Sequence, residues 1–214
     1  MSTRRVDSST GTSHGARRPE QADAGEARVV TGRYRTPWGM GALVVSEGRL
    51  VGVELPGAAA PANPAEPALQ AGSPAAPPSS QEAGPADRSA LTHWVGELEA
   101  YFRGERLSWR SEEITLDSLG LGPFEQVVYT TLLSIPPAVT VSYGMLAEMA
   151  GYPRAARAVG NAMAANPIPV VVPCHRVIRA DGTLGNYGND PAWKERLLTH
   201  ERTHAPASER GRVR

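Results

Sequence analysis

The chain has 214 residues, enough for one large domain or two small ones, and its 22 basic and 22 acidic residues give a net charge of zero. This balance excludes a protein that binds nucleic acid through a broad basic surface. It allows DNA contacts through a few placed arginines, which make up all the basic residues except Lys194. No apolar run approaches the ~20 residues of a bilayer span, and the first 26 residues lack the apolar core of a signal peptide. We therefore expect a soluble, cytoplasmic protein with no membrane partner.

Several segments have compositions that do not form a core. Residues 1–27 carry almost no large apolar side chain, which predicts a disordered tail. Residues 57–89 contain 7 Pro and 11 Ala, a composition typical of a semi-extended linker or long loop. Residues 204–214 are expected to form a frayed tail. The rest divides into an N-terminal unit, 28–106, interrupted by this linker, and a C-terminal unit, 117–203.

The N-terminal unit combines strand and helix patterns. Residues 28–55 carry Val, Leu and Tyr clusters separated by glycine-containing breaks at 38–41 and 47–48, which predicts two or three antiparallel strands. Apolar residues at helical spacing over 91–102 predict a helix that stops at Gly104. We expect a small sheet backed by one helix.

The C-terminal unit has a helical pattern. Pro123 suits a first helical position, and an apolar stripe continues to Ile135. Ser142 can cap a short helix over 143–150, and a glycine and a proline then precede a second helix over 154–165. This order is typical of a helix-turn-helix, a motif that also occurs in proteins that do not bind nucleic acid.

The second of these helices consists mostly of small residues, so its backbone could approach another surface closely. Arg154 and Arg157 are its only long cations. The pattern fits a helix packed tightly against another helix with both arginines in solvent. It equally fits a helix that docks on a nucleic acid and offers one or two arginines to the groove.

Cys174 is the only cysteine, which excludes an internal disulfide and a multi-thiolate zinc site. It follows an apolar, proline-flanked run within residues 166–178, which should be rigid and buried. His175 and Arg176 come directly after it, and a neighbouring cation or base lowers the pKa of a thiol and makes it a nucleophile. Adjacent side chains diverge, so Cys174 and His175 need a turn or a bridging water to cooperate. Composition alone leaves an inert buried cysteine equally open.

These motifs together resemble the O6-alkylguanine-DNA alkyltransferases, also called methylated-DNA–protein-cysteine methyltransferases. The resemblance runs from about Phe124 to Glu201. It implies an α+β protein with a small ribonuclease-H-like α/β N-terminal domain and a helical C-terminal domain that contains a (winged) helix-turn-helix. The motifs that carry it are Pro173-Cys174-His175-Arg176, Asn166-Pro167, Ala156-Arg157-Ala158-Val159-Gly160 and Gly185-Asn186-Tyr187.

The resemblance implies four catalytic residues. Cys174 would accept the alkyl group, and His175 would act as its base through a water molecule. Glu201 would hold the imidazole in the right tautomer, and Tyr143 would donate to ring nitrogen 3 of the departing guanine. Such a chain would supply a thiolate at neutral pH, much as a Ser-His-Asp arrangement activates its serine.

The resemblance also implies DNA-binding residues on the second helix. Arg157 would enter the base stack when the damaged guanine flips out, because no side chain can attack an alkyl group inside the duplex. Ala156, Gly160 and Arg154 would contact the DNA along the same helix.

Further residues would form the base pocket and its supports. Backbone groups of Val177 and Gly188 would read the guanine edge. Asn166 would tie the recognition helix to the cysteine loop, and Arg176 would be a second structural hinge. The implied pocket residues are Val177, Tyr187, Gly188, Asn189 and Met163.

One loop departs from the family pattern, which commonly places small residues, often Gly-Gly, after Tyr187. Here the sequence reads Gly188-Asn189-Asp190-Pro191, which adds volume and fixes the backbone. Asp190 either places negative charge near the site or caps the helix that begins near Trp193. We expect methyl groups to be accepted well and benzyl-sized groups to react slowly.

The implied function is DNA repair by direct, stoichiometric transfer of an alkyl (methyl) group from O6 of guanine to Cys174. The partner would be double-stranded DNA that carries O6-alkylguanine, the protein a monomer, and no metal or organic cofactor would be needed. A non-catalytic alkyltransferase-like protein is the first alternative, although such relatives replace the cysteine. A helix-turn-helix regulator would need base-reading side chains on the second helix, and a cysteine hydrolase would usually separate its Cys and His.

Overall fold

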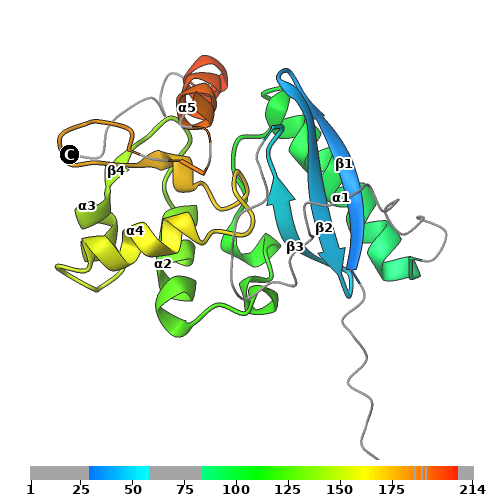
Figure 1. Ribbon diagram of the computed structural model, residues 1–214, viewed down its shortest axis with the longest axis horizontal. Coiled ribbons are helices and arrows are strands. Elements are labelled where there is room, and N and C mark those ends of the chain that lie inside the picture. Colours follow the sequence, from blue (N-terminus) through cyan, green and yellow to red (C-terminus); the bar gives the residue numbers. More distant parts are fainter. Residues whose placement is uncertain (1–28, 58–82, 186, 189, 191, 207–214) are drawn as a thin grey trace, which may run out of the picture.

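The computed structural model describes residues 29–57, 83–185, 187–188, 190 and 192–206. Within these ranges the fold is mixed α/β, with a three-stranded sheet, a two-stranded sheet and five α-helices. Figure 1 shows the larger sheet and α1 on one side of the molecule and the other helices beside them. None of the helices in these ranges has the length and apolar character needed to cross a membrane.

The larger sheet is antiparallel, in the order β1 (Val29–Thr36), β2 (Gly39–Ser46) and β3 (Arg49–Glu54). The second expected break is a tight turn in which Glu47 and Gly48 both have positive φ, the conformation that suits a two-residue hairpin. The first break is shorter than expected, because β2 begins at Gly39 and continues through Gly41. A Cβ at Gly41 would lie 2.2 Å from Cζ of Tyr34, so this glycine makes room for the ring instead of ending the strand.

Helix α1 (Pro85–Phe102) packs against this sheet and buries Trp94, Leu98, Tyr101 and Phe102. The predicted helix and its stop are confirmed, since Gly104 follows with a φ of +76°. The helix starts earlier than expected, because Pro85 occupies its first turn, where a missing N–H costs nothing. Residues 85–89 therefore belong to α1 and not to the expected 57–89 linker. Most of that linker, and the expected tail over 1–27, lie outside the described residues.

The C-terminal elements bring distant segments together. Short 3₁₀ turns, η1 (Ser111–Glu113) and η2 (Leu116–Leu119), lead from α1 toward α2 (Pro123–Leu133). Strands β4 (Val141–Ser142) and β5 (Val177–Ile178) pair in parallel, which places the start of α3 (Tyr143–Met149) beside the segment that follows Cys174. The remaining elements are α4 (Ala156–Ala164), η3 (Cys174–Arg176) and α5 (Ala192–His204).

The two short helices α3 and α4 pack against each other, as their pattern predicted. Ser142 caps α3, since its Oγ accepts a hydrogen bond from the Met145 backbone N–H at 3.1 Å. The second helix starts later than expected. Arg154 has a φ of +72°, outside the helical region, and α4 begins only at Ala156.

Hydrogen bonds join residues 53–56, at the end of β3 and just after it, to the C-terminal half of the chain. Val53 N–H of β3 donates to Pro167 O at 2.9 Å, and Trp193 Nε1 of α5 donates to Pro56 O at 3.1 Å. Helix α5 continues to His204, and Ala205 is buried, so the fraying expected from residue 204 does not start there. A cluster of buried apolar residues extends through both halves of the described chain. The segment around Cys174 is part of this cluster.

Candidate active site

A rigid, buried loop presents Cys174. The apolar residues before it, including Val170 and Val172, are buried as expected, and the Cys174 N–H donates to Val172 O at 2.8 Å. Val170 has a φ of +76°, which a β-branched residue adopts only where its surroundings enforce it. The loop then closes into η3, a tight turn that sends the Cys174 and His175 side chains to different partners. The backbone, and not a flexible side chain, therefore positions the thiol.

The Cys174 side chain is only 5% exposed but is hydrogen-bonded on two sides. Asn166 Nδ2 donates to Sγ at 3.1 Å, and the thiol donates to Tyr187 Oη at 3.6 Å. Burial raises the pKa of the Cys174 thiol, although the hydrogen bond from Asn166, the hydrogen bond with Tyr187 and the charge of Lys194 each oppose this. The resting residue is thus a thiol at neutral pH and not the thiolate expected from sequence, so its proton must leave when it reacts.

His175 is arranged to receive a proton. Its ring is fully buried, and burial lowers its pKa, which keeps the imidazole neutral. Nε2 lies 2.8 Å from Glu201 Oε1, so the carboxylate selects the tautomer that carries its proton on Nε2. Nδ1 is then the basic nitrogen, and no hydrogen-bond partner for it exists among the described residues.

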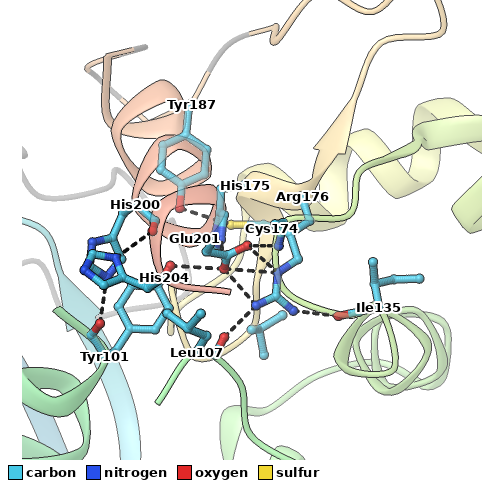
Figure 2. Close-up of polar contacts among 12 residues, drawn as sticks. Tyr101, Leu107, Ile135, Cys174, His175, Arg176, Tyr187, His200, Glu201 and His204 are labelled. Carbon is cyan, nitrogen blue, oxygen red and sulfur yellow. Dashed lines mark hydrogen bonds and ion pairs between the residues drawn. The ribbon is translucent and has the colours of Figure 1, made fainter. Parts of the chain in front are cut away.

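Glu201 is the centre of a buried polar network, and Figure 2 shows it beside His175, Arg176 and Tyr101. Arg176 donates to both carboxylate oxygens, from Nη2 to Oε1 at 2.7 Å and from Nε to Oε2 at 3.1 Å. Tyr101 Oη donates to Oε1 at 3.1 Å, and the Ala138 N–H donates to Oε2 at 2.8 Å. Burial would raise the pKa of Glu201, but His175 and Arg176 outweigh it and hold the pKa far below its usual range. The carboxylate is therefore a fixed negative charge beside the imidazole.

Arg176 ties this network to distant parts of the chain. Its side chain is buried, Nη1 donates to Ile135 O at 2.6 Å, and Nη2 donates to Leu107 O at 2.7 Å. The sequence indicated a hinge at this position but not an ion pair with Glu201. Tyr101 was missed altogether, because it lies 100 residues from Glu201 and its helical spacing already explained it as a core residue.

Tyr143 and Tyr187 approach the same lysine. Lys194 Nζ lies 5.8 Å from the ring centre of Tyr143 and 6.0 Å from that of Tyr187, and it donates to Val177 O at 2.5 Å. Burial lowers the pKa of Lys194 to about 8, while the nearby Cys174 raises it. Lys194 was also missed by the sequence analysis; its status as the only lysine, placed on the buried side of a helix, was the available signal.

The other residues expected around the base lie in different settings. The Val177 carbonyl already accepts a bond from Lys194, and Gly188 is exposed with a φ of +49°. Met163 is buried on the inner side of α4. Asn189 lies outside the described residues.

Asn166 connects α4 to the cysteine loop. It lies two residues beyond the end of α4, and its Nδ2 also donates to Val172 O at 2.9 Å. Its Oδ1 accepts from the Ile168 N–H at 3.1 Å, so the amide is held from both ends. A shift of Cys174 would therefore act directly on the residue that follows α4.

The outer face of α4 is open and lined with small side chains. Arg157 is exposed, Ala156 and Gly160 are half-buried, and Gly160 faces the Tyr143 ring, from which its Cβ would be 4.0 Å away. Arg154 is exposed in the turn before the helix and does not project from α4. The backbone of α4 can therefore approach a flat partner closely, with Arg157 as the longest projection.

Asp190 acts as a helix cap. Its Oδ1 accepts from the Ala192 N–H at 2.9 Å, and its backbone carbonyl accepts from the Trp193 N–H at 3.1 Å. Its Oδ2 is 3.6 Å from Arg196 Nη1. Of the two roles expected for Asp190, the structure supports capping of α5.

The lowered pKa values of two buried histidines predict how the free energy of unfolding depends on pH. His200 Nε2 is 2.7 Å from Tyr101 O, and burial lowers the pKa of both His200 and His175 below the ordinary 6.5. Below pH 6.5 the unfolded chain takes up protons that the folded chain excludes, so stability is complete above this pH and falls as the pH drops. We expect a slope of up to about 1.4 kcal/mol per pH unit for each histidine.

Urea unfolding between pH 8 and pH 5 measures this slope. His200→Gln should reduce it, whereas His93→Gln, which changes an exposed imidazole, should leave it unchanged. An unfolding free energy that stays constant or rises between pH 7 and pH 5.5 would contradict the assignment of both buried histidines as neutral.

Sequence comparisons place this site in a known context. Residues 123–203 match the sequence model described as "6-O-methylguanine DNA methyltransferase, DNA binding domain". A methylated-DNA–protein-cysteine methyltransferase of Mycolicibacterium paratuberculosis is 49% identical over 114 residues, which cover 53% of this chain and 67% of that protein. The mouse protein of the same name is 46% identical over 120 residues, covering 52% of this chain and 56% of its own length.

Solved structures agree with the sequence comparisons. The crystal structure of Mycobacterium tuberculosis OGT in complex with DNA is similar with a TM-score of 0.61 and 32% identity, covering 83% of this chain and 95% of that one. An O6-methylguanine methyltransferase variant from the same organism is similar with a TM-score of 0.64 and 36% identity, covering 84% and 96%. The similarity thus includes the N-terminal sheet as well as the helical half.

Proposed function

The chain belongs to the methylated-DNA–protein-cysteine methyltransferase family and acts in DNA repair by alkyl transfer, and we propose that Cys174 is the residue that accepts the alkyl group. One observation carries the proposal. The neutral His175 next to Cys174 is held through Nε2 by Glu201 at 2.8 Å, and its Nδ1 is a base with no hydrogen-bond partner among the described residues. A buried thiol with a raised pKa needs such a base before it can attack.

We propose that the proton leaves Cys174 as the sulfur attacks. A water molecule takes the thiol proton and passes one to His175 Nδ1, and the imidazolium forms next to the Glu201 carboxylate. The sulfur forms a bond to the alkyl carbon in line with O6, and the carbon–oxygen bond breaks with its electron pair going to guanine. A neutral thioether remains on Cys174 and has no route back to the thiol, so each molecule reacts once.

Tyr143 is proposed to donate to ring nitrogen 3 of guanine as negative charge builds on the base. Burial raises the pKa of its hydroxyl, which keeps the proton available for donation at neutral pH. Tyr187, Val177, Gly188, Asn189 and Met163 are proposed to surround the base. Methyl is proposed as the preferred group over benzyl.

Helices α3 and α4 are proposed to form a (winged) helix-turn-helix within the DNA-binding domain, and the N-terminal sheet with α1 a ribonuclease-H-like unit. The proposed substrate is O6-alkylguanine in double-stranded DNA, bound by a monomer through α4. Ala156 and Gly160 would let the helix backbone approach the groove, with Arg154 beside them at its start. The small side chains on the outer face of α4 support this close approach.

Two alternatives predict different results with a methylated oligonucleotide. A non-catalytic lesion-binding protein would bind the methylated duplex without acquiring its methyl group. A helix-turn-helix regulator would bind methylated and unmethylated duplexes of the same sequence equally well. The intact Cys174, His175 and Glu201 arrangement favours transfer over both.

Arg157→Ala should impair repair of a lesion in duplex DNA far more than reaction with a free O6-alkylguanine base. The arginine is exposed on α4 and is proposed to fill the gap left by the flipped base, a task that a free base does not require. Single-turnover rates on both substrates measure the difference. Arg202→Ala, which removes an exposed arginine from α5, is the control, and equal losses on both substrates would contradict the role of Arg157.

A further inference from the structure

Arg179 lies beside Tyr143 because of the small parallel sheet. In this sheet Val141 pairs with Val177 and Ser142 pairs with Ile178. Tyr143 and Arg179 are the next residues of the two strands, so they leave the ladder side by side. The same two strand ends thus fix the starting point of both side chains.

A tight turn holds the backbone of Arg179 in place. Its N–H donates to Thr183 O at 2.9 Å, and its carbonyl accepts from the Gly182 N–H at 3.0 Å. Asp181 stabilises the turn, since its Oδ1 accepts from Thr183 N–H at 2.9 Å and from Thr183 Oγ1 at 2.7 Å. The backbone of Arg179 therefore belongs to a turn that is closed by hydrogen bonds.

The Arg179 side chain and the phenol of Tyr143 both lie beside Gly185. A Cβ at Gly185 would lie 3.4 Å from Arg179 Nε and 3.8 Å from Tyr143 Oη, so both groups border this glycine. Burial raises the pKa of Tyr143, and the charge of Arg179 opposes that rise, as expected for a guanidinium near the phenol. The positive charge of Arg179 thus lies near the Tyr143 hydroxyl, the group proposed to face the base.

The Arg179 charge is also available to a ligand. The side chain is exposed, and no carboxylate forms an ion pair with it in the part of the chain that the structure describes. The acidic neighbour on the same turn, Asp181, uses its Oδ1 to hold Thr183. A guanidinium stays charged at all relevant pH values and binds phosphate through two parallel N–H groups.

Guanine chemistry indicates what this cation meets. Ring nitrogen 3 is bonded to the carbon that also carries nitrogen 9, the atom attached to deoxyribose. A side chain that contacts nitrogen 3 therefore faces the sugar side of the nucleotide, and a cation next to it faces the backbone. We propose that Arg179 binds a phosphate that flanks the extrahelical nucleotide and so positions the lesion opposite Cys174. The proposal rests on the proposed role of Tyr143.

Arg179→Gln tests the contact, with Arg33→Gln, an exposed arginine on β1, as a control for the loss of one charge. Arg179→Gln should weaken binding of lesion-containing duplex about tenfold and reduce the slope of log affinity against log salt by about 1. Its rate with a free O6-alkylguanine base should fall far less than its repair of lesion-containing duplex, because a free base has no phosphate. The control should show neither effect.

A methylphosphonate that replaces one flanking phosphate of the lesion completes the test. At one flanking position the parent protein should lose the same factor as Arg179→Gln, and the variant should lose nothing further on this neutral backbone. The proposal would be overturned if Arg179→Gln and the methylphosphonate lowered the affinity by independent, multiplying factors at both flanking positions. It would also be overturned if Arg179→Gln lowered the rate on the free base as much as on lesion-containing duplex. Absence of alkyl transfer by the parent protein would instead contradict the proposed function.

Discussion

Cys174→Ser is expected to abolish alkyl transfer while the affinity for lesion-containing duplex stays unchanged. A hydroxyl ionises far less readily than a thiol of pKa ~8.5, and His175 cannot make up this difference. Loss of an enzymatic nucleophile costs on the order of 10⁶-fold in rate, so no transfer should be detectable. Binding should survive because the small outer face of α4 and the exposed Arg157 do not contact Sγ. Transfer of a radioactive methyl group and a parallel binding titration measure the two quantities.

Matched variants separate chemistry from folding in this experiment. Cys174→Ala removes the hydroxyl as well, and it should also bind without transferring. Asn166→Ala keeps the thiol but removes the Nδ2 donor to Sγ at 3.1 Å, so transfer should be slower but present. Measurable single-turnover transfer by Cys174→Ser would contradict the assignment of Cys174 as acceptor.

Glu201→Ala is expected to reduce the free energy of unfolding by about 3–5 kcal/mol, because it removes the carboxylate that neutralises the buried Arg176 charge. The change also removes the acceptor for His175 Nε2, Tyr101 Oη and the Ala138 N–H. A loss of this size is a large part of the 5–15 kcal/mol that holds typical domains together. Urea unfolding at neutral pH measures it.

Two further variants test whether the network is the cause. Glu195→Ala, an exposed residue of the same helix, should change stability by no more than about 0.5 kcal/mol. Arg176→Met combined with Glu201→Leu should be more stable than Glu201→Ala alone, since neither buried charge remains. A loss below about 1 kcal/mol in Glu201→Ala would contradict the view that this carboxylate holds the site together.

The local patterns predicted most of the elements correctly. Val, Leu and Tyr clusters between glycine-containing breaks identified the strands of the sheet. Helical spacing identified α1 and α2, and cap, glycine and proline signals identified the pair α3 and α4. Boundaries were wrong where a backbone choice depends on tertiary contacts. Gly41 continues a strand because the Tyr34 ring lies against it, and Arg154 takes a positive φ that delays α4, although a proline precedes it.

The candidate site was predictable where its residues are neighbours in sequence. Cys174 and His175 could be recognised as candidates because they are adjacent in the sequence, and the resemblance to a known family added Glu201. Tyr101 and the Arg176 bonds to Leu107 and Ile135 depend on how segments far apart in the chain pack, which no local pattern encodes. The raised pKa of Cys174 likewise follows from burial, which appears only after folding.

Mass spectrometry of the intact protein, followed by peptide mapping, tests most directly whether Cys174 is the acceptor. The protein is incubated with excess duplex DNA that carries one O6-methylguanine per duplex. We expect each molecule to gain the mass of one methyl group in place of hydrogen, on the peptide that contains Cys174, with one guanine repaired per protein molecule. An unmodified Cys174 after repair, or more than one repaired guanine per molecule, would contradict transfer to this cysteine in a single turnover.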